Sequence, residues 1–165
     1  MINLVFKEVP ISDKGQVRQL AEHVIGNLER PEFFIPYADW EYDCFFEKSY
    51  GLIHGAYYED KLVGISQLYF SDEIISEAVQ FMGLSESKCC ELGGNLVNPD
   101  FRKKGIMNTL GAIQLKLATK IGFDYVIALA HPDNIGSIKA LDKLKFNYLK
   151  YGILSNGFER NFYLR

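Results

Sequence analysis

Between residues 88 and 146 the sequence alternates between strand-like and helix-like segments, and this alternation restricts the fold more than any other feature. Residues 88–97 and 124–130 are apolar enough to form buried strands, whereas apolar residues recur every three or four positions in 106–121 and 135–144. Such alternation predicts parallel strands in a sheet that helices cover on both faces. In the longer helix the predicted buried stripe is Ile106, Leu110, Ile113, Leu117 and Ile121.

The other segments supply further strands and helices by the same criteria. Strands are predicted over 3–9, 52–58, 61–70, 147–153 and 159–164. Helices are predicted after Ser12, near 39–47, and within 71–86, with Ser12 and Ser71 placed to cap two of them. The segment 71–86 is an insertion that serves either as a lid or as additional packing. We therefore expect an α/β fold in a single domain over 1–165, with a mixed central sheet of about seven strands flanked by helices on both faces.

Composition favours a globular cytoplasmic protein. Of the 165 residues, 48% are hydrophobic and 24% are charged, which is ordinary for a folded domain. The first residues lack the basic and then apolar order of a secretory signal, and no stretch is apolar enough to span a membrane. The three cysteines have no metal-ligand spacing, so we expect reduced thiols and no metal. The net charge of −3 argues against nucleic-acid binding.

Positive charge is concentrated where the strand 88–97 passes into the helix 106–121. The first N–H groups of a helix lack intrahelical partners and favour negative charge. Backbone amides near residues 103–108, together with Arg102, Lys103 and Lys104, therefore suit a pyrophosphate, and Gly105 permits close approach of the backbone. Taken alone, such a basic run is also compatible with a solvated turn.

Two spaced motifs in this region resemble the GNAT superfamily of N-acetyltransferases. The acetyl-coenzyme A signature of that family, V-x-P-x-x-R and then R-x-x-G-x-G/A opening a helix, is matched by Val97, Pro99, Arg102 and Gly105. A second element, N-x-x-[AS] opening a helix that is followed by phenylalanine, is matched by Asn134, Ser137, Leu144 and Phe146. The predicted order of elements agrees with the family as well, so the resemblance covers most of the chain.

Three departures from the family pattern lie near the expected site. Met107 stands where the family has a small residue next to the phosphates, and Lys145 replaces the usual glycine before the phenylalanine. Leu141 stands where many members have the tyrosine that protonates the leaving thiolate. The remaining candidates for that proton donor are Tyr148, Tyr151, Ser137 and solvent.

The resemblance implies that acetyl-coenzyme A lies between two separating strands, those that end at Val97 and Ala130. Gly93-Gly94 is typical of a bulge in the first of them, and backbone amides near Leu96 and Val97 would then polarise the thioester carbonyl. The residues expected to bind the coenzyme are Leu96, Val97, Arg102, Lys103, Lys104, Gly105, Ile106, Met107, Asn108, Asn134 and Ser137. For Asn134, capping of the following helix is a compatible second role.

An ammonium ion cannot attack a carbonyl, so a base must accept its proton. Glu91 is the first candidate; in a regular strand it shares a face with Val97, although a bulge would break that alternation. The resemblance adds that some members, notably histone acetyltransferases, place a glutamate base at the corresponding position. The alternative is a strand glutamate that is merely solvated or is paired with Lys88. His131 is the second candidate, as base or relay, and its alternative is a loop histidine bonded near Pro132.

The sequence therefore predicts an acetyl-CoA-dependent N-acetyltransferase, an acyltransferase acting on a small-molecule or peptide amine by direct attack in a ternary complex. The alternative is a catalytically weak or inactive acyl-CoA-binding sensor or interaction domain of the same fold. The aromatic segment 33–46 contains interspersed acidic residues and either lines a site for a cationic acceptor or completes the core. The last hairpin, with Asn156-Gly157 at its turn, offers an edge for a homodimer.

Overall fold

The computed structural model describes residues 2–165 and contains one seven-stranded sheet, in the order β1-β2-β3-β4-β5-β7-β6. The strands are β1 (Val5–Glu8), β2 (Gly51–Tyr58), β3 (Lys61–Tyr69), β4 (Cys89–Val97), β5 (Tyr125–Ala130), β6 (Asn147–Ile153) and β7 (Glu159–Leu164). The helices are α1 (Lys14–Gly26), α2 (Glu41–Cys44), α3 (Asp72–Met82), α4 (Ile106–Ile121) and α5 (Ile135–Lys143). Every predicted strand and helix is present in the predicted order.

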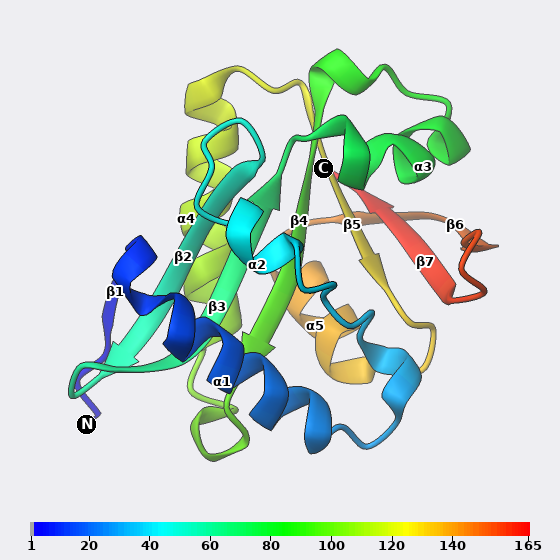
Figure 1. Ribbon diagram of the computed structural model, residues 1–165. Helices are drawn as coiled ribbons and strands as arrows, with labels where there is room; N and C mark the ends of the chain where they lie inside the picture. The colour runs from blue at the N-terminus through cyan, green and yellow to red at the C-terminus, as the bar shows by residue number, and fades with distance from the viewer. Residues whose placement is uncertain (1) are drawn as a thin grey trace.

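Helices cover both faces of the sheet, as Figure 1 shows: α1, α2 and α3 lie in front, and α4 and α5 lie behind. The front core joins Val17 and Leu20 of α1 to Ile65 of β3 and Ile127 of β5. Behind the sheet, separate clusters pack α4 and α5 against the strands. The α/β class, the mixed sheet and the two helical layers are therefore confirmed.

The insertion 71–86 is packing rather than a lid. Ile75, Ala78, Val79 and Met82 of α3 are all buried in the front core. In the middle of the helix, Glu77 accepts hydrogen bonds from the backbone N–H and the hydroxyl of Ser155 (2.5 and 3.0 Å), in the hairpin between β6 and β7. The front core and the β6–β7 hairpin together hold α3 in place.

The pairing of the strands is less parallel than the alternation predicts. Only β4 and β5 pair in parallel among the described residues, and the other five neighbouring pairs are antiparallel. The reason is that β7 returns between β5 and β6, so the strand that follows α5 does not reach β5. Strand β6 is left as an edge, with Tyr148, Leu149, Tyr151 and Ile153 exposed.

Three local predictions are wrong. Ser71 stands at the N-cap of α3, but its side chain makes no capping hydrogen bond. Ser12 does not cap α1, because residues Ile11–Asp13 form a 3-10 turn and the helix begins at Lys14 after Asp13. The face of α4 also differs from the predicted stripe: Ile121 is 50% exposed, whereas Gln114 is fully buried. The Gln114 side-chain NH₂ group donates hydrogen bonds to the carbonyls of Leu52 (3.3 Å) and Ser66 (2.8 Å), whereas the buried side-chain oxygen has no hydrogen-bond partner within residues 2–165.

Strands β4 and β5 pair over only three residues, from Cys89 opposite Tyr125 to Glu91 opposite Ile127. Beyond that point they diverge, as can be followed in Figure 1 from the top of the sheet downward. On its other side β4 contains the expected bulge: Ile65 pairs with Leu96 but Gln67 pairs with Gly93, and Gly94 has a φ of 57°. The predicted separation of the two strands and the predicted bulge are both present.

Candidate functional site

A cleft of about 860 Å³ lies where β4 and β5 have separated, between the beginnings of α4 and α5 and the end of α1. Ten of the eleven residues predicted to bind a coenzyme line it: Leu96, Val97, Arg102, Lys103, Gly105, Ile106, Met107, Asn108, Asn134 and Ser137. Lys104 is the exception, and its Nζ donates instead to the Asp100 carbonyl (3.3 Å). One cleft therefore brings together residues that are up to 41 positions apart (Leu96 and Ser137).

The cationic end of the cleft is built by the turn from β4 into α4. Asn98 starts this turn, since its side-chain oxygen accepts the N–H of Asp100 (3.0 Å). Lys103 and Gly105 then take positive φ angles of 60° and 78°, which fold the chain tightly into the first turn of α4. No ion pair forms at Arg102 or Lys103 within residues 2–165, so both charges remain available to an anion.

The opposite wall of the cleft is the beginning of α5. Asn134 caps this helix, because its side-chain oxygen accepts the N–H of Ser137 (3.2 Å). Asn108 ties the two helices together by donating from its side chain to the Ala140 carbonyl (3.2 Å). Met107 is partly buried and lines the cleft, so it lies beside the open space without filling it.

Backbone groups of β4 face the gap between the strands. The Asn98 N–H donates to the Val63 carbonyl of β3 (2.9 Å), and Leu96 pairs with Ile65 on the same side. Since successive N–H groups of a strand point to opposite sides, the Val97 N–H is turned toward β5, with which it has no pairing. The gap therefore offers a hydrogen-bond donor along its floor.

Glu91 lies at the fork, on the front face of the sheet. Leu92 packs behind the sheet, and a Cβ placed on Gly93 would meet both the Glu91 carboxylate and the Tyr69 ring at 3.0 Å, which places Glu91 with Tyr69 in front. Val97 packs behind, beside Ile106 of α4. Glu91 and Val97 therefore lie on opposite faces, because the bulge at Gly94 breaks the alternation that a regular strand would have kept.

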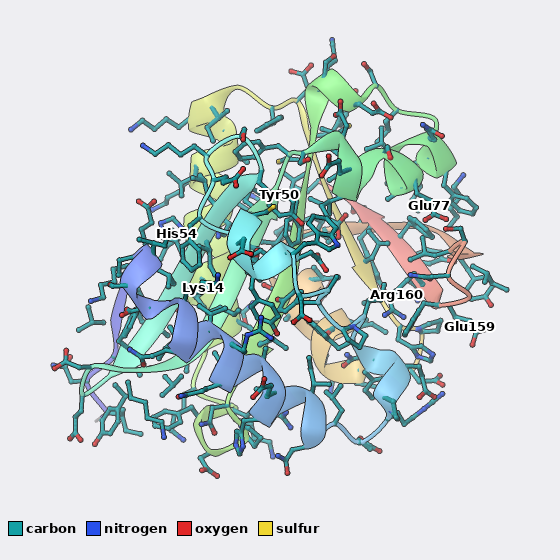
Figure 2. All side chains as sticks on the ribbon, in the orientation of Figure 1. Lys14, Tyr50, His54, Glu77, Glu159 and Arg160 are labelled. Carbon is teal, nitrogen blue, oxygen red and sulfur yellow. The ribbon has the colours of Figure 1, made fainter. Side chains whose placement is uncertain are left out.

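The surroundings of Glu91 disfavour its charged form. Burial raises the pKa of Glu91 to about 8, and the Arg160 guanidinium opposes that rise. Arg160 is itself buried, and it donates to the carbonyls of Glu32 (3.1 Å) and Glu159 (2.6 Å). Figure 2 shows Arg160 beside Glu159 near the start of β7.

His131 follows β5 and is 3% exposed. Its Nδ1 accepts the N–H of Asp133 (3.1 Å), its Nε2 lies 3.9 Å from a carboxylate oxygen of Glu159, and its ring packs on Phe33. Neither His131 nor Glu91 is among the residues that line the cleft. The structure therefore separates the two candidate bases from the coenzyme-sized space, on the side of β7.

The sequence missed the third wall of the cleft, which comes from the end of α1 and the segment after it: Val24, Leu28, Glu29, Arg30, Phe33 and Phe34. Arg30 spans the cleft by pairing with both Glu32 (2.7 Å) and Asp133 (2.5 Å). Asn95 was also missed; it lines the cleft, and its buried side-chain oxygen has no hydrogen-bond partner within residues 2–165. The one available signal was a polar residue between apolar ones near the end of a buried strand.

The aromatic segment 33–46 divides between the two roles considered for it. Tyr42 and Phe45 are buried in the front core. Phe33 and Phe34 line the cleft instead. Between them, Tyr37 donates its hydroxyl hydrogen to the Gly94 carbonyl in the bulge (3.0 Å).

Among the described residues no helix is long and apolar enough to cross a membrane. In the same part of the chain no three histidine, cysteine, aspartate or glutamate side chains gather as a metal-holding group.

Comparison with known proteins gives one family. The sequence model of the acetyltransferase (GNAT) family matches residues 22–146. Among curated protein sequences, none matches this chain significantly.

Solved structures share the fold at low sequence identity. An N-acetyltransferase from Staphylococcus aureus Mu50 has a TM-score of 0.76 at 17% identity, over 99% of this chain and 98% of its own. A ribosomal-protein-alanine N-acetyltransferase from Brucella melitensis has 0.74 at 16%, over 98% of each chain. A phosphinothricin acetyltransferase from Sinorhizobium meliloti, solved in complex with acetyl-CoA, has 0.75 at 16%, over 98% of this chain and 87% of its own.

Proposed function

Because the chain belongs to the acetyltransferase (GNAT) family, we propose that it is an N-acetyltransferase that transfers acetyl from acetyl-CoA to a small-molecule or peptide amine. The observation that carries this proposal is the cleft between β4 and β5, which joins an unpaired cationic turn to free strand backbone. The two ends of the cleft match the two ends of the coenzyme. The cationic turn and the helix N–H groups suit its phosphates, and the free strand backbone suits its amide-rich pantetheine arm.

The residues of the cleft fit acetyl-CoA in the chemistry of their donors. Arg102, Lys103 and the first amides of α4 suit the pyrophosphate, and Gly105 leaves the approach open, since a Cβ there would meet no atom within 4 Å. The Val97 N–H and the side chain of Asn95 suit the pantetheine arm. The relative from Sinorhizobium meliloti was solved with the same molecule, which supports this assignment.

When bound, acetyl-CoA would supply an acetyl group activated as a thioester: the amine nitrogen bonds to the acyl carbon, the C–S bond breaks, and coenzyme A leaves as a thiolate that takes a proton from solvent. The β4 backbone donors hold and polarise the acyl carbonyl, and each such donor is worth about 3 kcal/mol in acyl-transfer enzymes. The ionised form of Glu91 accepts the proton of the amine; the raised pKa of about 8 makes this carboxylate a stronger base than an ordinary one, and it also keeps much of the group protonated below that pH. Glu91 lies on the front face, so the amine approaches from the side of α1 and α2, opposite the helices that hold the phosphates.

The decisive experiment is thermal unfolding with coenzyme A, acetyl-CoA and ATP, because a ligand that binds only the native state raises the unfolding midpoint. We expect both coenzymes, and not ATP, to raise it. The absence of a shift at about 1 mM coenzyme would contradict the proposal, since a functional cofactor site saturates well below that concentration. A positive result leads to an amine screen with Glu91→Gln as the inactive control, and coenzyme binding without turnover of any amine would favour the sensor alternative.

A further inference from the structure

The hydroxyl of Tyr37 lies at the centre of a small polar network around the β4 bulge. It donates to the Gly94 carbonyl (3.0 Å) and accepts from the side-chain amide of Gln67 (3.1 Å). Gln67 is 2% exposed and lies on β3, directly across the bulge from Gly93. Two neighbouring elements, β3 and the segment before α2, therefore meet at one carbonyl of β4.

The network leaves no room for a side chain at Gly94. A Cβ there would lie 2.4 Å from the Tyr69 hydroxyl and 2.8 Å from both the Tyr37 hydroxyl and the Gln67 amide. The φ of 57° at this residue is also in the left-handed region that favours glycine. Glycine is needed here both for its conformation and to let the three side chains approach the backbone.

The ring of Tyr37 is held as firmly as its hydroxyl. Phe34, Tyr42 and Phe45 pack edge-on against it, with ring centroids 5.2, 5.5 and 4.7 Å away. Burial raises the pKa of Tyr37, so the hydroxyl keeps its proton and stays a donor to Gly94 throughout the neutral range.

The Gly94 carbonyl belongs to the same peptide unit as the Asn95 N–H. A trans peptide is planar, and its C=O and N–H point in opposite directions. A hydrogen bond that draws the carbonyl toward Tyr37 thus turns the Asn95 N–H away from Tyr37, and Asn95 lines the cleft. The orientation of a cleft-side donor is consequently set by Tyr37, a residue that does not itself line the cleft.

We propose that Tyr37 is a positioning residue: it fixes the Gly94–Asn95 peptide so that the β4 bulge presents its N–H donors to the acyl group, and Gln67 in turn orients Tyr37. This inference rests on the proposed function, since only an acyl-transfer reaction uses those donors. Tyr37 acts through the backbone and does not itself touch the reacting atoms.

The test compares Tyr37→Phe, which removes only the hydroxyl, with Tyr42→Phe, whose ring belongs to the same aromatic cluster and whose hydroxyl is not bonded to the bulge. We expect Tyr37→Phe to lower kcat about tenfold or more while KM for acetyl-CoA and Kd for coenzyme A stay within about twofold. In the ligand-free protein the Asn95 amide should shift in the NMR spectrum and exchange its hydrogen faster. Tyr42→Phe should change neither.

Gln67→Met provides a second variant, because it removes the donor that orients Tyr37 and leaves every tyrosine in place. It should show the same loss of kcat and the same change at the Asn95 amide. This variant therefore still tests the inference if Tyr37→Phe fails to fold. An Asn95 amide and a kcat that match those of the wild type in both variants would overturn the inference. If the wild-type protein binds no coenzyme, the proposed function fails, and the NMR comparison still decides whether Tyr37 fixes the peptide.

Discussion

Glu91 of β4 pairs with Ile127 of β5, and this is the last pair before the two strands separate. The carboxyl group therefore lies at the fork of the sheet, enclosed enough that its pKa rises to about 8. A group held neutral at such a position affects the stability of the protein as well as its chemistry, because protonation and folding are coupled.

The free energy of unfolding should fall as the pH rises from about 4.5 to about 8 through the contribution of Glu91. Over that range the folded protein keeps the proton that the unfolded chain has released, so folding opposes ionisation. Glu91→Gln removes this pH-dependent contribution to the free energy of unfolding. Its midpoint in thermal unfolding should exceed that of the wild type at pH 8 and approach it at pH 5. A difference that is constant across this range would mean that Glu91 ionises as an ordinary carboxyl group.

Gly94→Ala should be strongly destabilising, by more than about 2 kcal/mol, because the new Cβ collides with the Tyr69 hydroxyl and strains the backbone. Gly157→Ala is the matched control: its φ of 87° is also in the left-handed region that strains an L side chain, but no atom lies within 4 Å of the added Cβ. Chemical denaturation should give a loss of about 1 kcal/mol for the control. Equal losses at both positions would show that space around the bulge is not limiting.

The double substitution Arg102→Gln, Lys103→Gln should weaken coenzyme A binding about tenfold, because two unpaired cations at the cleft are lost. Titration calorimetry at low and high salt checks this, and the difference from the wild type should shrink as salt screens the charges. Lys104→Gln is the control, since Lys104 does not line the cleft. An effect of Lys104→Gln as large as that of the double variant would place the phosphates elsewhere.

Asn95→Leu should change stability and affinity in opposite directions. The substitution removes a buried side-chain oxygen without a partner, so the ligand-free protein should unfold at a higher temperature. Coenzyme A should bind more weakly, whereas adenosine 3′,5′-bisphosphate, which has no pantetheine arm, should bind as before. A variant that is less stable and binds coenzyme A normally would show that Asn95 serves the fold alone.

The sequence predicts most of the fold because the signals are local. The apolar periodicity of 106–121 and 135–144, the Asn156-Gly157 turn and the two motifs around Val97 and Asn134 each depend on residues within one or two elements. The face of α4 was mispredicted because Gln114 is buried by hydrogen bonds to two strand carbonyls, and no pattern of apolar residues encodes such bonds.

The candidate site is predictable where it is built from one turn, as at Arg102 and Gly105. The wall formed by Arg30, Phe33 and Phe34 is not, because it depends on how a segment without periodicity folds back over the sheet. The facing of Glu91 depends on the bulge at Gly94, and a single extra residue reverses every side chain that follows it.

The short contact between β4 and β5 divides the sheet into two panels, one of four strands and one of three, joined at a seam of three residue pairs. A molecule that lies between β4 and β5 beyond Glu91 would hydrogen-bond to both strands. It would thereby connect the two panels along the part of the seam where the strands do not pair. Ligand binding in the cleft should therefore slow the amide hydrogen exchange of strands that the ligand does not contact.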